Sequence, residues 1–278
     1  MLVDLKKILK QAEAGGFAVP AFNVYNMETV MGVVSAAEKL RAPVIMQFYS
    51  RLATSGVADY LAPVILRAAE KTDVPVCMHL DHGEGKHAAV IALRNGATGI
   101  MVDNSTLSFC ENVSATAEVV KIAETLGIGV EGELGHVGKT ADGAENDVNE
   151  YTQPEETVQY VKQTGVSALA IMVGTAHGRY KKAPQIDIER IRKIKDMTKI
   201  PLVLHGGSGV PEDQIKKAIK AGIRKINFGT DLCFSFLDAV FETDKGICAI
   251  DLFMKKPIES VQKFAASKIK LLGADGKA

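Results

Sequence analysis

The sequence of 278 residues lacks an excess of either charge, paired cysteines and any long apolar run. Lys and Arg number 33, as do Asp and Glu, and this balance argues against electrostatic binding to nucleic acid or to an anionic membrane. The four cysteines form no CxxC pair, which is typical of reduced thiols in the cytosol. No apolar run reaches the roughly 18 residues of a membrane span, and the charged, amphipathic start is unlike a signal peptide. We therefore expect a cytoplasmic protein without nucleic-acid or membrane partners.

Linkers and low-complexity tracts are also absent, which predicts that residues 1–278 form a single domain. Short β-rich apolar runs alternate with helical stretches along the chain. Most of the runs are apolar without strict alternation, as is typical of parallel strands that are covered on both faces. The eight runs span residues 17–24, 43–48, 74–81, 99–103, 129–134, 168–174, 201–206 and 225–230.

The segments between these runs carry helix signals. In 108–127 apolar residues recur every three or four positions, and in 211–221 Pro211 suits the first helical position and Gly222 the stop. Eight β-α repeats predict an α/β protein with a (β/α)8 TIM barrel and additional helices at the N-terminus and the C-terminus. A doubly wound open sheet is the rival architecture, but it would have a glycine-rich loop after its first strand, where this chain has "YNMETV".

Polar side chains collect at the predicted C-terminal ends of the strands, where barrels carry their chemistry. The third strand ends in Asp81 and His82, the fourth in Asp103, and the seventh in His205, while the sixth runs into a loop with His177. Three neutral imidazoles around one divalent ion, with an open position, are a typical catalytic zinc arrangement. The alternative is that these histidines are three unrelated polar residues at strand ends.

Strand alternation poses a difficulty for this metal site, because it places His79 and Asp81 on one face and His82 on the other. His82 can reach the mouth of the barrel only if the pleat ends there, which the following "GEG" permits. His79 is then expected to be a buried, hydrogen-bonded strand residue. His87 is expected on a helix surface and His136 in a loop.

Two glycine-rich stretches predict an anion site. "HGGSG" (205–209) follows the seventh strand and "NFGTD" (227–231) ends the eighth. Their backbone amides, with the hydroxyls of Ser208 and Thr230, are suited to phosphate, and barrels commonly bind phosphate in these two loops. Lys181 could add a charge-assisted contact. The alternative is that both stretches are only turns.

Seven motifs resemble the class II, metal-dependent fructose- and tagatose-bisphosphate aldolases, and they keep their order from the first helix to the last residue. The motifs are "PAFNV", "HLDHG", "VEGELG", "GTAHGRYK", "LHGGSG", "INFGTDL" and "KIKLLGADGKA". The resemblance implies a lyase of carbohydrate metabolism, as in glycolysis. Such an enzyme cleaves fructose or tagatose 1,6-bisphosphate reversibly to dihydroxyacetone phosphate and an aldehyde such as glyceraldehyde 3-phosphate. It also implies one Zn²⁺ or another divalent ion per subunit, a monovalent cation near the phosphate, and a homo-oligomer (dimer or tetramer).

The resemblance assigns a role to each matching position. Asp81 matches the catalytic aspartate that exchanges a proton with the C4 hydroxyl of the sugar. The remaining matches are the zinc ligands His82, His177 and His205; the positions that hold dihydroxyacetone phosphate, Gly178, Lys181, Gly206, Ser208, Asn227 and Thr230; the cleft residues Asn23 and Gln47; and Asp103 and Glu133, in a further layer of polar groups or at an alternative metal position.

The residues themselves favour metal chemistry over a Schiff base. Cleavage leaves a carbanion next to a carbonyl, and a Lewis acid can spread that charge as an enediolate. A metal-free aldolase uses a lysine instead, but no lysine is expected inside a strand near its C-terminal end. Lys225 is expected to open the eighth strand, at the wrong face, and Lys181 lies in a loop.

Two regions depart from the family pattern. In the loop after the fifth strand, the position of the family's proton-transferring glutamate falls on Ala141, so we expect Asp142, or alternatively Glu145, to take its role. "QFYSRLATSG" after the second strand and Gly229 also differ, which leaves open the far end of the sugar and the stereochemistry at C4. An aldolase for another ketose phosphate, a metal-dependent sugar-phosphate epimerase and a non-catalytic sugar-phosphate binder therefore remain as alternatives.

Overall fold

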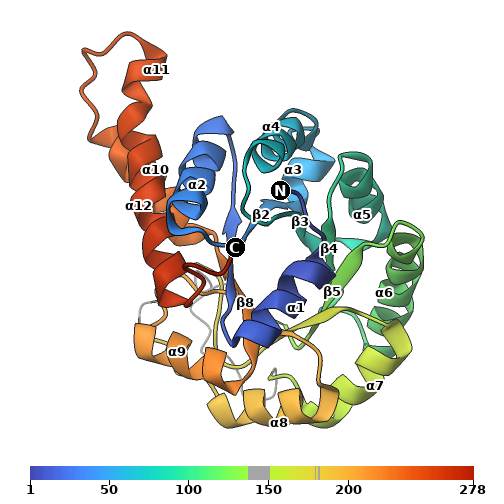
Figure 1. Cartoon of the computed structure of the whole chain (residues 1–278). Helices are drawn as coiled ribbons and strands as arrows, with labels where there is room; N and C mark the ends of the chain where they lie inside the picture. The colour runs from blue at the N-terminus through green and yellow to red at the C-terminus, as the bar shows by residue number, and fades with distance from the viewer. Residues whose placement is uncertain (137–150, 179, 181) are drawn as a thin grey trace.

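The computed structural model describes residues 1–136, 151–178, 180 and 182–278. Eight parallel strands close into a barrel in the order β1-β2-β3-β4-β5-β6-β7-β8, with helices around it (Figure 1). The predicted (β/α)8 TIM barrel is thereby confirmed. The positions predicted at Lys181, Ala141, Asp142 and Glu145 lie outside the described residues.

All eight strands overlap the predicted runs. The largest difference is at β8, which begins two residues before the predicted start at 225, and β3 continues two residues beyond the predicted end at 81. The strands are β1 (Val19–Asn23), β2 (Val44–Tyr49), β3 (Val76–Gly83), β4 (Gly99–Val102), β5 (Gly129–Leu134), β6 (Ala168–Ile171), β7 (Leu202–Leu204) and β8 (Ile223–Phe228).

Local signals explain where the helices begin and end. Ser108 and Glu111 form a reciprocal capping box at the start of α6. Pro211 is the residue before α9 and not its first helical residue, and Gly222 ends this helix as predicted. The helices are α1 (Leu5–Gly15), α2 (Met27–Leu40), α3 (Ser50–Thr54), α4 (Ala58–Lys71), α5 (Gly85–Arg94), α6 (Phe109–Glu124), α7 (Pro154–Thr164), α8 (Ile188–Thr198), α9 (Glu212–Ala221), α10 (Thr230–Phe241), α11 (Ile250–Phe253) and α12 (Lys255–Leu271).

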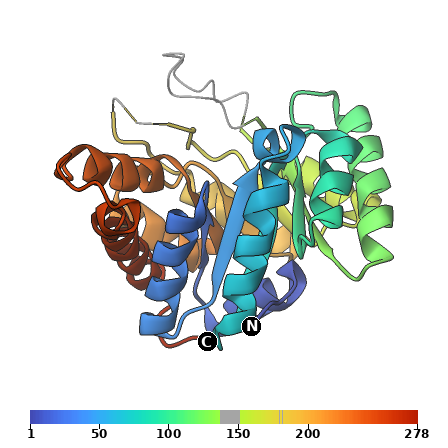
Figure 2. The same ribbon diagram turned by 90° about the horizontal axis from the view of Figure 1, so that it is seen from above.

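Helix α1 closes the N-terminal end of the barrel. Its apolar residues Leu5, Ile8, Leu9 and Ala12 are buried, and the backbone N–H of Leu5 donates to the carbonyl of Thr98 at 3.0 Å. Both chain termini lie at this end of the molecule (Figures 1 and 2). The opposite end, where the strands terminate, is therefore the one left for a site. No helix in the described ranges is both long and apolar enough to span a lipid bilayer.

The additional C-terminal helix α12 packs against α2 through a glycine. A Cβ atom on Gly32 would lie 2.6 Å from Cγ1 of Val261 and 3.0 Å from the backbone oxygen of Ile258. Backbone cannot move aside as a flexible side chain can, so α2 approaches α12 this closely only because position 32 has no side chain.

Replacing Gly32 with alanine should therefore destabilise the protein. Alanine favours a helix over glycine by about 1 kcal/mol, but overpacking costs about 1–3 kcal/mol, so we expect a net loss of about 1–2 kcal/mol in the free energy of unfolding. Urea denaturation of Gly32→Ala measures it, and the cost should be smaller in a Val261→Ala background. A more stable Gly32→Ala protein would show that α2 and α12 are not in tight contact.

Candidate active site

The end of β3 brings Asp81 and His82 into the mouth of the barrel together. His82 has a φ of +48°, in the left-handed region, and the β3–β4 register shifts between Leu80 and Gly83. This irregularity breaks the alternation that would send the two side chains to opposite faces. Gly83 is required beside it, since a Cβ there would lie 2.5 Å from the carbonyl oxygen of Met101. The prediction that the pleat ends here is confirmed, and the strained backbone is of the kind found at functional sites.

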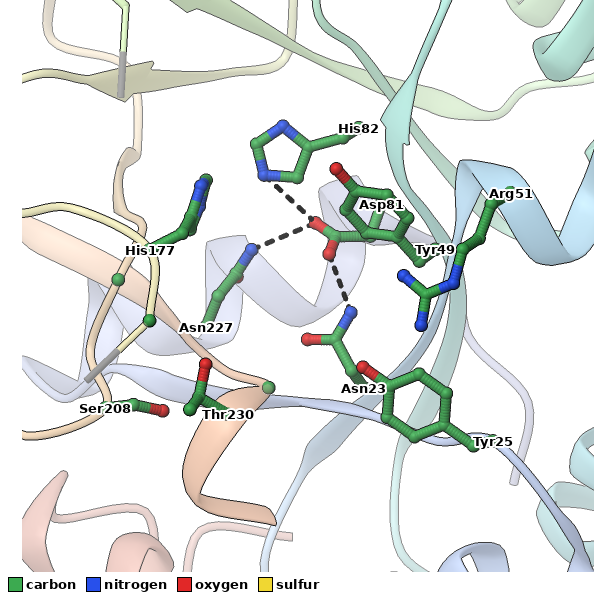
Figure 3. Close-up of a pocket in the computed structure, with 13 residues that line it drawn as sticks. Asn23, Tyr25, Tyr49, Arg51, Asp81, His82, His177, Ser208, Asn227 and Thr230 are labelled. Atoms are coloured by element: carbon green, nitrogen blue, oxygen red, sulfur yellow. Dashed lines mark hydrogen bonds and ion pairs between the residues drawn. The ribbon is translucent and has the colours of Figure 1, made fainter. Parts of the chain in front are cut away.

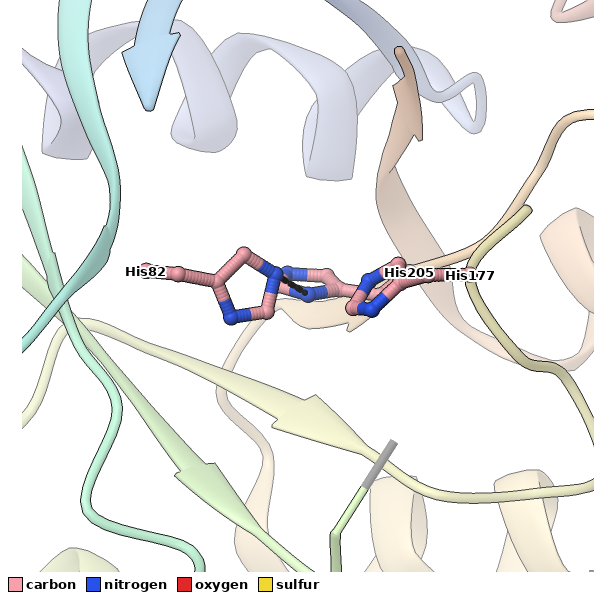
Figure 4. A group of neighbouring side chains, drawn as sticks. All are labelled: His82, His177 and His205. Carbon is pink, nitrogen blue, oxygen red and sulfur yellow. Dashed lines mark hydrogen bonds between the residues drawn. The ribbon is translucent and has the colours of Figure 1, made fainter. Parts of the chain in front are cut away.

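Three histidines from different parts of the barrel meet in this mouth (Figure 4). His82 ends β3, His177 follows β6 and His205 follows β7, and one ring nitrogen from each lies within 4.8 Å of the others. Nε2 of His82 and Nδ1 of His205 are 3.0 Å apart. The structure thus brings together the three predicted metal ligands. A set of three imidazoles at this separation fits a tetrahedral divalent ion with one open position.

The charges around these histidines also fit a cation. Burial lowers the pKa of His82, but the carboxylates of Asp81 and Asp103 outweigh it and raise the pKa to about 9. Burial lowers the pKa of His177 to about 4 and that of His205 well below its usual value. Two imidazoles are therefore neutral and ready to act as ligands, while a proton on His82 holds a place that a metal ion can take.

Asp103 and Glu133 surround the same histidine. Nδ1 of His82 lies 2.7 Å from Oδ2 of Asp103 and 4.0 Å from Oε2 of Glu133. Burial raises the pKa of Asp103, but its hydrogen bond with His82 has the larger combined effect and lowers it. His82, Asp103 and Glu133 are a second group whose ligand atoms lie within 4.8 Å of one another. This geometry agrees with the predicted position of both carboxyl groups.

Two amides hold the carboxylate of Asp81 in the middle of the cavity (Figure 3). Asn23 donates to Oδ2 of Asp81 at 2.7 Å, and Asn227 donates to Oδ1 at 3.1 Å. Gln47 is fully buried and donates to Oδ1 of Asn23 at 3.0 Å, so it orients Asn23 from behind and is not itself in the cavity lining. Because both bonds to Asp81 come from neutral donors, its negative charge remains available.

The loops after β7 and β8 meet at another side of the cavity. The backbone N–H of Asp231, in the first turn of α10, donates to the hydroxyl of Ser208 at 3.1 Å. Gly206 has a φ of +65°, and a Cβ there would lie 2.3 Å from the carbonyl oxygen of Ala176. The start of α10 and the glycine backbone therefore offer N–H groups to the cavity, which suits an anion.

Most of the predicted site residues line one cavity of about 260 Å³. The predicted residues in its lining are Asn23, Asp81, His82, His177, Gly178, Gly206, Ser208, Asn227 and Thr230. His205, Asp103 and Glu133 lie directly behind this lining. His87 is exposed on α5 and His136 is exposed after β5, as expected.

Sequence reasoning missed three larger residues of the lining, Tyr25, Tyr49 and Arg51. Tyr25 lies two residues after Asn23, and Tyr49 lies two residues after Gln47. Their positions just after the first and second strands were the available signal. The departure from the family pattern at "QFYSRLATSG" contains both Tyr49 and Arg51.

The expected place of Lys225 was wrong. It is the third residue of β8, it is fully buried inside the barrel, and its Nζ lies 2.9 Å from Oε2 of Glu131. Glu131 in turn contacts Nε2 of His205 at 2.9 Å through its other oxygen. Lys225 does not line the cavity, so its ion pair with Glu131 explains its presence without a nucleophilic role.

His79 belongs to the same buried layer, and its expected hydrogen bond was also wrong. Its Nε2 lies 3.6 Å from Oε2 of Glu131, and neither ring nitrogen has a hydrogen-bond partner among the described atoms. Burial and the nearby charge of Lys225 lower the pKa of His79 to about 3. The imidazole is therefore neutral, and the charge of Glu131 is balanced by Lys225.

Removing the charge of Lys225 should strongly destabilise the protein. Lys225→Met leaves the buried carboxylate of Glu131 without its partner, which typically costs about 3–5 kcal/mol, and Lys225→Met with Glu131→Gln should cost less. The control is Lys86→Met, which removes a surface ion pair with Glu118 and should cost less than about 1 kcal/mol. Chemical denaturation compares the four proteins, and equal losses at Lys225 and Lys86 would contradict a buried charge pair.

Known proteins share both the sequence and the fold of this chain. The model of the family "Fructose-bisphosphate aldolase class-II" matches residues 3–277. The "Uncharacterized protein YdjI" of Escherichia coli (strain K12) is 37% identical over 280 residues and is covered in full, as is this chain. The crystal structure of that YdjI aldolase has a TM-score of 0.90 at 35% identity, with 100% of both chains covered. A fructose-bisphosphate aldolase structure from Campylobacter jejuni has a TM-score of 0.83 and covers 100% of this chain and 97% of its own, but at 24% identity it supports the fold alone. With the family match spanning nearly the whole chain, the protein belongs to the class II fructose-bisphosphate aldolases and is a lyase.

Proposed function

We propose that this aldolase cleaves a ketose 1-phosphate reversibly to dihydroxyacetone phosphate and an aldehyde, with Zn²⁺ bound by His82, His177 and His205. Fructose or tagatose 1,6-bisphosphate, which would give glyceraldehyde 3-phosphate, is the first substrate to test, because the family model is that of fructose-bisphosphate aldolases. The observation that carries the proposal is the position of Asp81 in one cavity with the histidine cluster and the two glycine-rich loops.

Asp81 is the group that moves the proton in the cleavage step. Its carboxylate takes the proton of the C4 hydroxyl as the C3–C4 bond breaks and C4 becomes the aldehyde carbon. Asn23 and Asn227 orient both carboxylate oxygens through their amides, at 2.7 Å and 3.1 Å. A divalent ion at the histidine cluster would act as the Lewis acid that stabilises the negative charge left on the dihydroxyacetone phosphate half.

The two glycine-rich loops hold the phosphate of that half. Gly178, Gly206, Ser208 and Thr230 face the cavity, and α10 begins at Thr230 with its N-terminus toward it. Backbone N–H groups and hydroxyls there bind a phosphate without a balancing cation from the described lining at this end. The phosphate then fixes the substrate so that its reacting carbons lie beside Asp81 and His82.

Assembly and location complete the proposal. We expect a homo-oligomer in the cytoplasm, and exposed apolar side chains near the C-terminus support the assembly. Phe241 at the end of α10 is 76% exposed and Ile250 at the start of α11 is 74% exposed. Large apolar side chains in such a position are characteristic of protein contacts.

The metal assignment predicts the loss of zinc on removal of one ligand. The wild type should bind about one Zn²⁺ per chain with Zn–N distances of about 2.0–2.1 Å, and His205→Ala should lose the ion and the activity together. Elemental analysis and X-ray absorption measure this. Binding should also release a proton at pH 7, because the pKa of His82 without metal is about 9.

The matched control for this experiment is His87→Ala, which removes an exposed histidine of α5 and should keep the zinc and the activity. A His205→Ala protein with full metal content would exclude His205 as a ligand.

Asp81→Ala should fold and keep the metal but lose turnover by several orders of magnitude, because no other described carboxylate lines the cavity. A coupled assay for triose phosphate with a panel of ketose mono- and bisphosphates measures the cleavage. A loss of less than tenfold, about 1.4 kcal/mol in the barrier, would show that Asp81 is not the main acid–base group. Formation of a new ketose without triose phosphate would indicate an epimerase, and no product from any substrate would indicate a binding protein.

A further inference from the structure

We propose that Arg51 recognises an anionic group, a carboxylate or a second phosphate, at the end of the substrate that lies far from the bound phosphate. The inference rests on the proposed cleavage of a ketose 1-phosphate, and it names the class of substrate.

Arg51 is held at the cavity by aromatic contacts. It lies in α3, two residues after the end of β2, and its guanidinium carbon is 5.7 Å from the ring centre of Tyr25 and 5.2 Å from that of Tyr49. Both tyrosines also line the cavity, and the ring of Tyr49 is 5.6 Å from that of His82. Cation–π contacts on two rings limit the conformations of Arg51 and direct its charge to the cavity (Figure 3).

No described carboxylate neutralises this guanidinium. The arginines that form ion pairs in the described ranges are Arg67, Arg190, Arg192 and Arg224. Burial raises the pKa of both Tyr25 and Tyr49 above its usual value, so their phenols stay neutral and cannot balance Arg51. Arg51 is exposed to solvent in the open mouth, where a ligand can reach it. Its donors are therefore free for an anion that comes from outside.

The order of groups along the cavity determines which part of a substrate meets Arg51. Figure 3 shows Ser208 and Thr230 on one side of the cavity and Arg51 on the other, with Asp81 between them. A ketose whose 1-phosphate is bound at Ser208 and whose C4 hydroxyl is at Asp81 extends its later carbons toward Arg51. The group at the far end of the sugar thus meets the guanidinium.

Carboxylate and phosphate share the chemistry that fits this site. A guanidinium presents parallel N–H donors that match two oxygens of either group, whereas a hydroxymethyl end offers one neutral oxygen. Losing a hydrogen bond to a charged group typically costs about a tenfold to hundredfold change in binding. Arg51 should therefore favour a far-end anion over a neutral end by about this factor.

The test compares ketose 1-phosphates of equal length and stereochemistry that end in a hydroxymethyl, a carboxylate or a phosphate. For each, kcat/KM is measured with the wild type, Arg51→Gln and Arg51→Lys. Arg51→Gln should lower kcat/KM for at least one anionic substrate about 10- to 100-fold more than for the hydroxymethyl substrate. Arg51→Lys should recover part of this selectivity, since it keeps the charge but loses the fork. The anionic arm with the larger loss identifies carboxylate or phosphate as the preferred group.

The control is Arg67→Gln, which removes an exposed arginine of α4 outside the cavity lining and should change no ratio. Equal losses on all three substrates in Arg51→Gln would indicate a structural role and overturn the proposal, as would unchanged rates on all three. Failure of the proposed function looks different, because the wild type would then release dihydroxyacetone phosphate from none of them.

Discussion

A continuous chain of polar contacts through the barrel supports the whole site. Lys225 contacts Glu131 at 2.9 Å, Glu131 contacts His205 at 2.9 Å, His205 contacts His82 at 3.0 Å, and His82 contacts Asp103 at 2.7 Å. The five residues come from five different parts of the barrel wall, β8, β5, β7, β3 and β4. Each buried group has its charge or its ring orientation set by the next, because an unpaired charge at this depth would be costly. The histidine cluster is therefore oriented by the barrel interior before any ligand arrives.

The cavity above this chain separates its tasks by the kind of donor at each place. Neutral amides of Asn23 and Asn227 surround Asp81 and leave its charge uncompensated, as a proton acceptor requires. Hydroxyls and backbone N–H groups of Ser208 and Thr230 form one side, and the guanidinium of Arg51 forms another. Each donor suits a different part of a sugar phosphate, so the substrate is oriented along its length.

Most of the fold could be predicted because parallel barrel strands are buried on both faces and appear as apolar runs. Prediction was weakest where a charged residue interrupts such a run. Lys225 was taken as the start of a strand because an unpaired lysine cannot be buried, yet the structure pairs it with Glu131, 94 residues earlier in the chain. His79 was likewise expected to have a hydrogen bond that its packed surroundings do not supply.

The sequence by itself determined the eight strands, the placement of polar residues at their C-terminal ends and, through its motifs, the aldolase family. Only the tertiary structure decided which side chains meet. The left-handed backbone at His82 depends on the register shift against β4, and no local pattern reveals it. Arg51 joined the cavity because closure of the barrel places β1 beside β2, so that Tyr25 and Tyr49 lie within reach of its guanidinium. Contacts between residues distant in the chain follow from barrel closure, which a linear pattern does not contain.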